Sequence, residues 1–102
     1  MPLQLAQLPA GVGAAALQAA LAKRYQDEPF VKVQALNEPV TLADGFFDVQ
    51  ACNDSNRIDI FVFGNAQQAV LMARLDNLGK GASGAAVQSM NLHLGLPEVM
   101  GL

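Results

Sequence analysis

Side chains able to bind or polarise a ligand are concentrated in one run near the C-terminal end, residues 76–88 (DNLGKGASGAAVQ), which we call the signature segment. Asn77 and Gln88 carry amides, which donate and accept hydrogen bonds at once, and Lys80 carries an ammonium group. Glycines within the segment allow the backbone to come close to a ligand. If a helix begins here, its free N–H groups and positive dipole end favour an anionic or polar ligand.

The same pattern has a purely structural interpretation, in which a helix with a small-sided start packs tightly on a sheet and Lys80 is solvated. Ser83 would cap that helix, and Gly95 stands where a glycine commonly ends one. A buried stripe is predicted from three apolar residues at helical spacing: Val87, Met90 and Leu94. The chain has neither a P-loop nor a strand–GxGxxG–helix unit, so spacing alone favours the structural interpretation.

Nucleophilic catalysis needs a nucleophile beside an activating base, and the candidates here are Cys52 and His93. They lie in different predicted elements, and no motif joins them. We interpret Cys52 as a small hydrophobic side chain and His93 as a surface or packing residue. The polar run at residues 53–56 lacks the ligand spacing of a calcium loop, so we interpret it as a turn. The sequence therefore predicts no catalytic residue and no metal ligand in this chain.

Hydrophobic periodicity predicts the elements that position the signature segment. A helix is predicted at residues 14–25, with an apolar stripe of Ala14, Leu17, Leu21 and Tyr25. Strands are predicted at residues 2–8, 30–34, 46–52, 57–63 and 68–75, with a loop at residues 36–45. The strand at residues 57–63 is apolar on both faces and is expected to be central and covered. The order β-α-β-β-β-β-α indicates an α+β fold with two helices and a mainly antiparallel or mixed sheet.

Composition limits the class of protein. The 102 residues are enough for one domain, residues 1–102, and 52% hydrophobic content is too high for a disordered chain. Only 15% of residues are charged, which suggests that part of the surface meets another domain or subunit. A net charge of −3 gives no electrostatic basis for binding nucleic acid.

Three further features concern the setting of the chain. No segment reaches the roughly 20 apolar residues of a membrane span, so no membrane contact is expected. One cysteine excludes an internal disulfide, and the N-terminus carries no basic region of a signal peptide, which together suggest the cytoplasm. A strand that begins so near residue 1 suggests that the chain was cut from a longer one.

The signature segment, with Asn91-Leu92, the tail GLPE at residues 95–98 and the run at residues 53–57, closely resembles the C-terminal part of N-acetyl-gamma-glutamyl-phosphate reductase, in its shorter-chain branch. The resemblance covers nearly all of this chain but only about the last third of a whole enzyme. The related aspartate-semialdehyde dehydrogenases share a DNLxKGAA-like run. The resemblance implies the fold of the C-terminal dimerisation and catalytic domain of glyceraldehyde-phosphate-dehydrogenase-like enzymes.

The resemblance also implies a function for the longer protein. It would be an NADPH-dependent oxidoreductase of arginine biosynthesis that reduces an acyl phosphate to a semialdehyde. The N-terminal dinucleotide-binding domain and the catalytic cysteine and histidine would lie outside this chain. The isolated chain is therefore expected to be inactive and to bind no NADP(H).

For this chain the resemblance implies residues on the cofactor side: Asn77, Lys80, Gly81 and Gln88. The two amides would pair with the nicotinamide carboxamide, and Gly81 would permit close approach. Lys80 would either attract phosphate or stabilise the loop. Gly84 and Ala85 stand where the family often has Gly-Gln, so one polar contact of the helix face is expected to be absent.

Two other functions remain open at this stage. The chain could be a non-catalytic self-association module that keeps the signature segment as a packing element. It could also be the C-terminal piece of an aspartate-semialdehyde dehydrogenase. In each case the expected partners are a second copy, bound through the sheet, or an N-terminal dinucleotide-binding domain.

Overall fold

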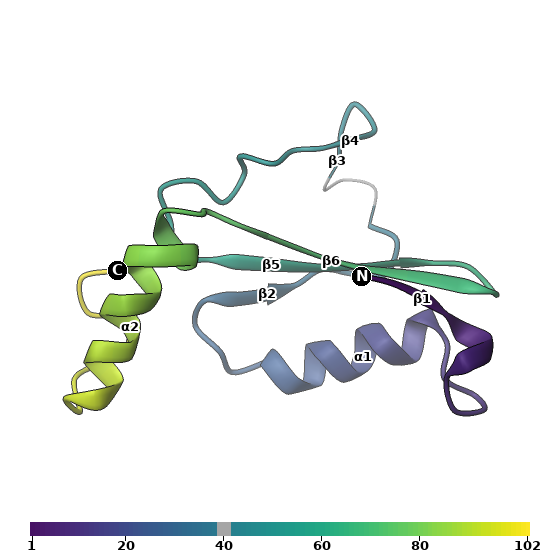
Figure 1. Ribbon diagram of the computed structural model, residues 1–102, viewed down its shortest axis with the longest axis horizontal. Helices are drawn as coiled ribbons and strands as arrows, with labels where there is room; N and C mark the ends of the chain where they lie inside the picture. The colour runs from purple at the N-terminus through teal and green to yellow at the C-terminus, as the bar shows by residue number, and fades with distance from the viewer. Residues whose placement is uncertain (39–41) are drawn as a thin grey trace.

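The computed structural model describes residues 1–38 and 42–102 of the chain. Its centre is a four-stranded mixed sheet in the order β1-β6-β5-β2 (Figure 1). The strands are β1 (Pro2–Gln4), β2 (Val31–Val33), β5 (Ile58–Gly64) and β6 (Gln68–Leu75). β5 and β6 form an antiparallel hairpin, β1 runs antiparallel to β6, and β2 runs parallel to β5. With its two helices this sheet confirms the predicted α+β class.

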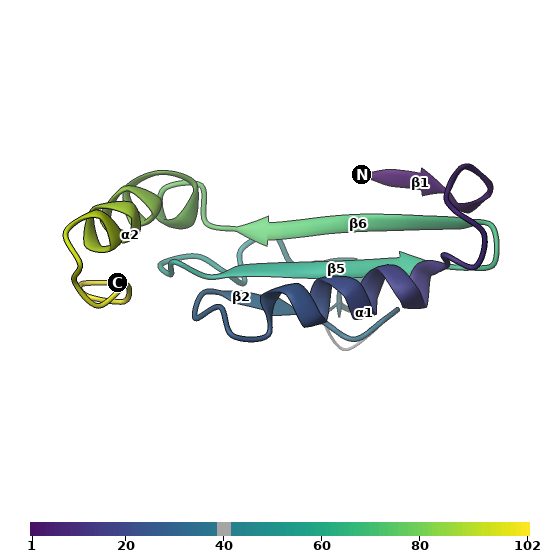
Figure 2. The ribbon, with the colours of Figure 1, turned by 90° about the horizontal axis from the view of Figure 1, so that it is seen from below.

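The remaining elements flank the sheet. They are the helices α1 (Ala14–Tyr25) and α2 (Gly84–His93), the 3₁₀ turn η1 (Leu5–Gln7), the π-helical turn η3 (Gly79–Ser83) and the short pair β3 (Leu42–Ala43) and β4 (Phe46–Phe47). α1 lies along one face of the sheet, and the segment carrying β3 and β4 lies on the other side (Figure 1). α2 continues beyond the end of the β5–β6 hairpin rather than covering the sheet (Figure 2).

The core lies between α1 and the hairpin. Ala14, Val62 and Ala69 are buried there, and partly buried leucines surround them: Leu5, Leu17, Leu21, Leu36 and Leu71. Gly64 allows the start of α1 to pack closely on the hairpin, because a Cβ atom at residue 64 would lie 2.6 Å from the Ala14 Cβ and 2.9 Å from the Gln68 carbonyl oxygen. Three residues of the predicted stripe, Ala14, Leu17 and Leu21, thus pack at the core between α1 and the hairpin.

The central position predicted for residues 57–63 is confirmed, since β5 pairs with β6 on one side and β2 on the other. Val62 faces α1, whereas Asp59 and Phe61 point to the opposite face, and all three are 2% exposed or less. Phe47 covers that second face, with its ring edge-on to Phe61 at a centroid distance of 4.9 Å. β5 is therefore covered on both faces, as its apolar pattern indicates.

The first predicted strand is too long. Residues 2–8 were expected to be extended, but β1 ends at Gln4 and the chain turns through η1. The Leu5 amide donates to the Gln67 carbonyl at 2.9 Å, and the Leu8 amide then donates to the Leu5 carbonyl at 3.0 Å. Because β6 begins only at Gln68, no strand partner continues past this point, and a local turn satisfies the backbone instead.

The strand predicted at residues 46–52 is also too long, because β4 contains only Phe46 and Phe47. The Asp48 carboxylate accepts the Gln50 amide at 2.9 Å, and the Asn53 amide donates to the Gln50 carbonyl at 2.9 Å. These local hydrogen bonds favour turns over an extended backbone. In the predicted loop at residues 36–45, Leu42 and Ala43 pair with β4 as an additional short strand, and residues 39–41 lie outside the described part.

Candidate functional site

The signature segment begins with a turn fixed by Asp76. Its carboxylate accepts the amides of Leu78 and Asp54, each at 2.9 Å. These backbone hydrogen bonds, first that of Leu78 and then that of Asp54, lower the pKa of Asp76 below its usual value. Asp76 thereby ties the end of β6 to the polar turn at residues 53–56, and both turns sit at the same end of the hairpin.

The helix of the signature segment starts earlier than predicted. Gly81 donates to the Asp76 carbonyl at 2.9 Å and Ser83 to the Leu78 carbonyl at 3.0 Å, the i to i+5 spacing of a π-helical turn. Ser83 is helical, and its hydroxyl donates to the Leu78 carbonyl at 2.7 Å. The prediction that Ser83 caps the helix is therefore wrong, because the backbone is already wound from Gly79.

Two glycines of the segment are required by packing within the chain. A Cβ atom at residue 84 would overlap the Oδ1 atom of Asn56 and lie 2.9 Å from the Gly79 carbonyl oxygen. A Cβ atom at residue 79 would lie 2.5 Å from the Ser55 carbonyl oxygen. Gly81 is less restricted, since its nearest neighbours would be 3.3 Å away. The start of α2 is thus pressed against the polar turn, as the structural interpretation of these glycines requires.

The structure brings Lys80 and Gln88 together. The Lys80 ammonium group donates to Gln88 Oε1, and the same oxygen accepts Asn56 Nδ2 at 3.0 Å. Gln88 Nε2 donates to Glu98 Oε1 at 2.6 Å. The Lys80 Nζ atom also lies 5.6 Å from the centroid of the Phe30 ring, within the range of a cation–π contact.

Asn77 does not join this network. It lies exposed in the turn before η3, and no hydrogen bond to its side chain occurs within residues 1–38 and 42–102. Gly81 lies beside it, with the Asn77 Oδ1 atom 3.4 Å from the position a Cβ atom at residue 81 would take. Of the four candidate residues, two are therefore bonded to each other and two line the adjacent turn.

The buried stripe predicted for the last helix is wrong. Val87 is only half-buried, Met90 is 51% exposed and Leu94 is 60% exposed. The reason is the position of α2 beyond the sheet, where no other described element covers it (Figure 2). Several apolar side chains on α2 and the tail are exposed, and together we call them the α2 apolar surface: Met90, Leu92, Leu94, Leu96, Val99 and Met100.

The predicted end of this helix is confirmed. Gly95 has a positive φ of 68°, the Leu96 amide donates to the Asn91 carbonyl at 2.8 Å, and the Gly95 amide donates to the Leu92 carbonyl at 3.3 Å. This is the Schellman arrangement that a glycine at this position permits. The tail therefore turns back along α2 instead of continuing away from it.

A buried ionic cluster on the sheet was missed by the sequence analysis. Arg74 Nη2 donates to Asp59 Oδ2 at 2.8 Å, and Arg57 Nε donates to Asp59 Oδ1 at 2.9 Å. Asp59 and Arg74 stand opposite each other in the hairpin register. The available signal was an acidic residue inside an apolar strand and a single basic residue in its predicted partner.

Charge compensation decides the ionisation of this cluster. Burial alone raises the pKa of Asp59, but hydrogen bonds from Arg74 and Cys52 and the charge of Arg57 outweigh it, so the pKa is lowered. Burial lowers the pKa of Arg57, but the attraction of Asp59 dominates and raises it. Asp59 and Arg57 are therefore both charged at neutral pH.

The same cluster holds the segment at residues 46–56 against the sheet. Arg74 Nη1 donates to the Asp48 carbonyl at 2.8 Å, and Arg57 Nη2 donates to the Ala51 carbonyl at 2.8 Å. Cys52 is 1% exposed, and its thiol lies 3.4 Å from Asp59 Oδ2. Cys52 is thus a buried packing residue with a polar contact, which agrees with its interpretation as a small core side chain.

The described residues hold no further cluster with obvious chemistry. Among them, no group of three or more histidine, cysteine, aspartate or glutamate side chains is arranged to hold a metal ion. Nor does the described chain contain a helix long and apolar enough to cross a membrane. His93 is exposed near the end of α2, and no hydrogen bond joins it to another described side chain.

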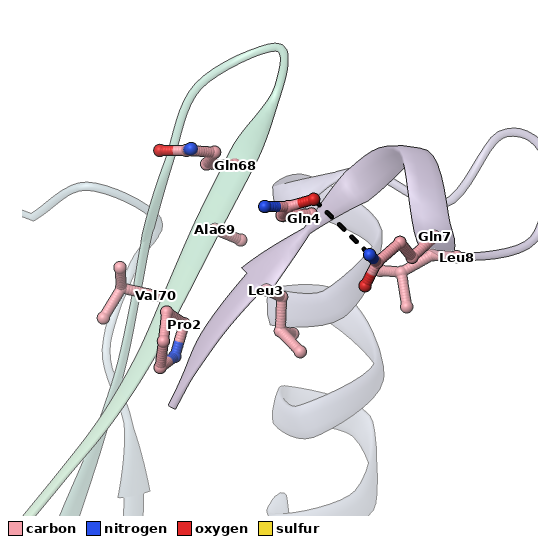
Figure 3. Close-up of a pocket in the computed structure, with 8 residues that line it drawn as sticks. All are labelled: Pro2, Leu3, Gln4, Gln7, Leu8, Gln68, Ala69 and Val70. Carbon is pink, nitrogen blue, oxygen red and sulfur yellow. Dashed lines mark hydrogen bonds between the residues drawn. The ribbon is translucent and has the colours of Figure 1, made fainter.

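Two of the hollows in the described structure lie at opposite ends of the sheet. One, of about 460 Å³, lies between β1, η1 and β6 and has no ionisable side chain in its lining, where Gln7 donates to Gln4 (Figure 3). The other, of about 360 Å³, lies between the polar turn and the start of α2, with Asp76 and Ser83 in its lining. The second adjoins the signature segment, but none of the four candidate residues, Asn77, Lys80, Gly81 and Gln88, is in its lining.

Comparison with known proteins shows which families and relatives the sequence of this chain is similar to. Residues 3–77 match the family described as semialdehyde dehydrogenase, dimerisation domain. The chain is 56% identical over 86 residues to N-acetyl-gamma-glutamyl-phosphate reductase 2 of Nostoc sp., covering 81% of this chain and 27% of that protein. It is 48% identical over 102 residues to N-acetyl-gamma-glutamyl-phosphate reductase of Burkholderia ambifaria, covering 98% of this chain and 32% of that protein.

A third relative, N-acetyl-gamma-glutamyl-phosphate reductase 2 of Pseudomonas putida, is 43% identical over 103 residues, with 99% of this chain and 32% of that protein covered. The chain thus spans about a third or less of the length of these relatives. The family match ends at residue 77, whereas the Burkholderia and Pseudomonas alignments cover nearly all of the chain and so take in most of the signature segment and the tail as well.

Proposed function

The chain belongs to the semialdehyde dehydrogenase dimerisation-domain family, and from that premise we propose that it is the C-terminal part of an N-acetyl-gamma-glutamyl-phosphate reductase. The observation that carries this proposal is the 43–48% identity to two such reductases over 98–99% of the chain. The whole enzyme would reduce N-acetyl-glutamyl phosphate to its semialdehyde, release phosphate and serve arginine biosynthesis. A reducing compartment such as the cytoplasm is consistent with the single free cysteine, Cys52.

The catalytic centre of such an enzyme would lie outside this chain. An acyl-phosphate reduction of this kind requires a thiolate nucleophile, a base and a hydride donor. Cys52 is buried in the ionic cluster, and His93 lies on a different element. We therefore propose that residues 1–102 form a single C-terminal domain and that a preceding dinucleotide-binding domain supplies the nucleophile and the dinucleotide fold.

The signature segment fits one part of a nicotinamide cofactor. When bound, NADPH would supply the hydride. The Asn77 amide is exposed and unbonded among the described residues, so it can pair with a carboxamide. Lys80 is positively charged, and its hydrogen-bond partner, Gln88, is neutral, so the charge is not balanced by that contact. We propose that Asn77, Lys80, Gly81 and Gln88 form the cofactor side of this domain.

The α2 apolar surface supports a second part of the proposal. Met90, Leu92 and Leu94 are each more than half exposed, so apolar side chains at the end of α2 are left uncovered on more than one side. The relatives are about three times as long as this chain, so a further domain is available to cover the surface. We propose that the dinucleotide-binding domain docks there, which would bring its cofactor towards the signature segment.

Self-association forms the third part. The family description names dimerisation, and the sheet face opposite α1 is only partly covered by residues 46–56. Phe63, Val70 and Met72 share that face, and Val70 is 37% exposed. We propose that a second copy packs on this uncovered part of the sheet. The same exposed surfaces also suit the alternative function, a non-catalytic association module without a dinucleotide domain.

One experiment separates these functions. The reading frame upstream of residue 1 is cloned with this chain, and oxidation of NADPH is measured with N-acetyl-glutamyl phosphate and with aspartyl phosphate. Turnover of the first substrate supports the proposal, and turnover of the second indicates an aspartate-semialdehyde dehydrogenase. A chain that starts at Met1 in the cell and forms a stable oligomer without either activity would establish the association module instead.

A further inference from the structure

The tail after α2 is fixed by a buried amide. Asn91 is 1% exposed, and its Nδ2 group donates to the carbonyl oxygens of Glu98 at 3.1 Å and Met100 at 2.8 Å. The Asn91 carbonyl accepts the Leu96 amide at 2.8 Å. Because both ends of the turn are bonded to one buried residue, the backbone of Glu98 has a defined position beside α2.

From that position Glu98 reaches Gln88. Gln88 Nε2 donates to the Glu98 carboxylate at 2.6 Å, while Gln88 Oε1 accepts both Lys80 Nζ and Asn56 Nδ2. The Gln88 amide thus lies between a carboxylate and an ammonium group. Its oxygen faces the two donors, and its NH₂ group faces the acceptor.

Only one orientation of this amide satisfies its neighbours. Rotation by 180° would exchange oxygen and nitrogen. The oxygen would then face the Glu98 carboxylate, and the NH₂ group would face the Lys80 ammonium and the Asn56 amide. All three hydrogen bonds would be lost, and each end of the amide dipole would face a charged group of the same sign. The charges of Glu98 and Lys80 therefore select the orientation.

We propose that Glu98 is a positioning residue for the cofactor side of the signature segment. It orients Gln88, and the oriented Gln88 oxygen holds the Lys80 ammonium in one place. This inference rests on the proposed function, which sets Lys80 and Gln88 against the cofactor. It adds a residue of the tail, beyond the signature segment, to the set that determines cofactor affinity.

The arrangement preserves the charge of Lys80. The ion pairs found among the described residues join Arg24 to Glu28, and Arg57 and Arg74 to Asp59, so none of them involves Lys80. Glu98 reaches Lys80 only through a neutral amide. A direct Lys80–Glu98 pair would neutralise the ammonium, whereas the inserted amide leaves it positive and ordered for an anionic group.

The first test is kinetic and uses the full-length reductase with NADPH. In E98A we expect the KM for NADPH to rise about fivefold or more, with kcat changed less than about twofold, because ground-state and transition-state binding are weakened alike. E98Q keeps an oxygen acceptor of the same reach and should give a KM between those of wild type and E98A. E28A removes an exposed glutamate three residues after α1 and serves as the matched control, in which we expect no change in the KM for NADPH.

The second test is structural and uses the 102-residue chain. In wild type the two Nε2 protons of Gln88 should give well-separated NMR signals, one of them slow to exchange with solvent. In E98A their separation should fall, while the Gln18 side-chain amide, which donates to the Gln34 carbonyl, should be unchanged. This readout needs neither cofactor nor activity.

The outcomes separate the inference from the proposed function. A normal KM in E98A together with a raised KM in Q88A would overturn the positioning role and leave the function intact. A normal KM in both variants would remove Gln88 from the cofactor side and overturn the inference with it. If the full-length protein has no reductase activity, the proposed function fails, and an unchanged Gln88 NMR signal in E98A would independently show that Glu98 does not orient the amide.

Discussion

Asp59 and Arg74 face each other across the β5–β6 hairpin, with the Arg74 Nη2 atom 2.8 Å from Asp59 Oδ2 and both side chains less than 10% exposed. The guanidinium also lies 5.2 Å from the ring centroid of Phe47 and 4.9 Å from that of Phe61. One buried pair thereby joins the two long strands to each other and to the segment at residues 46–56. The position of residues 46–56 therefore depends on Arg74, whose charge is balanced by Asp59 in the folded chain.

Replacement of Arg74 should be severely destabilising. In Arg74→Met the Asp59 carboxylate stays buried with only part of its compensation, which costs about 3–5 kcal/mol of unfolding free energy. The double variant D59N/R74M should be more stable than R74M, because it removes the buried charge as well. Urea titration measures both. Arg24→Met breaks an exposed ion pair and should cost less than about 1 kcal/mol.

A result in which R74M and R24M are equally stable would show that the buried pair contributes no more than a surface pair. The double-variant cycle then gives the coupling between the two side chains directly.

Stability should fall at acidic pH through Asp59. Its pKa is lower in the folded chain than in the unfolded chain, so folding is favoured wherever the group is ionised in both states. This contribution is fully present above the unfolded value of about 3.9 and is lost as pH falls through the lower folded value. The pKa of Asp76 is also lowered, so protonation of Asp76 at acidic pH likewise reduces the stability of the fold.

The measurement is the urea midpoint between pH 6 and pH 2 for wild type and D59N. D59N should lose part of the acid dependence that the wild type shows. Parallel curves for wild type and D59N would contradict the assignment to Asp59.

Gly84→Ala should disrupt the start of α2. The new methyl group would overlap the Asn56 Oδ1 atom and crowd the Gly79 carbonyl, and both neighbours belong to bonded turns that cannot easily move. Overpacking of this kind costs about 1–3 kcal/mol. Gly13→Ala is the matched control, because residue 13 has no atom within 4 Å of a Cβ and a φ of −114° that alanine adopts freely. Thermal unfolding of both variants measures the difference, and G84A should have the lower melting temperature. Equal melting temperatures would show that the turn can move to accommodate the methyl group.

Much of the fold could be predicted from local patterns. The alternation of apolar residues locates β5 and β6, and Gly95 with Pro97 marks the end of α2. The contact between Gly84 and Asn56 could not be predicted, because it joins residues far apart in sequence through backbone packing that leaves no periodic trace. Met90 and Leu94 follow a stripe of the kind that is normally buried, yet the element that would cover them is not among the described ones.

The candidate site, like the fold, was only partly predictable from the sequence. Its residue types suggested ligand binding at Lys80 and Gln88, and the structure places these two side chains together. The partners that orient them, Asn56 and Glu98, lie 32 and 10 residues from Gln88 and reach it from different turns. Neither is marked by spacing, so only the folded arrangement reveals them.

Self-association should depend on the uncovered sheet face. Val70→Lys places a charge among apolar side chains that we propose meet a second copy, so it should shift the chain towards monomer at micromolar concentration. Ala19→Lys adds the same charge on an exposed position of α1 and should leave the association unchanged. Light scattering over a concentration series measures both. Association that survives V70K but is lost in A19K would move the interface to the helical side.

Asn77 provides the last test, because its amide is exposed and has no hydrogen-bond partner among the described residues. In the full-length reductase, Asn77→Ala should raise the KM for NADPH or lower kcat by about five- to 150-fold, as expected for one lost polar contact worth about 1–3 kcal/mol. The variant's melting temperature should stay near that of wild type, since no internal bond is removed. Asn53→Ala, another exposed amide in the neighbouring polar turn, is the control and should leave the kinetics unchanged. Equal kinetics for N77A and wild type would make Asn77 a simple turn residue, whereas a kinetic loss without a stability loss would place its amide against the cofactor.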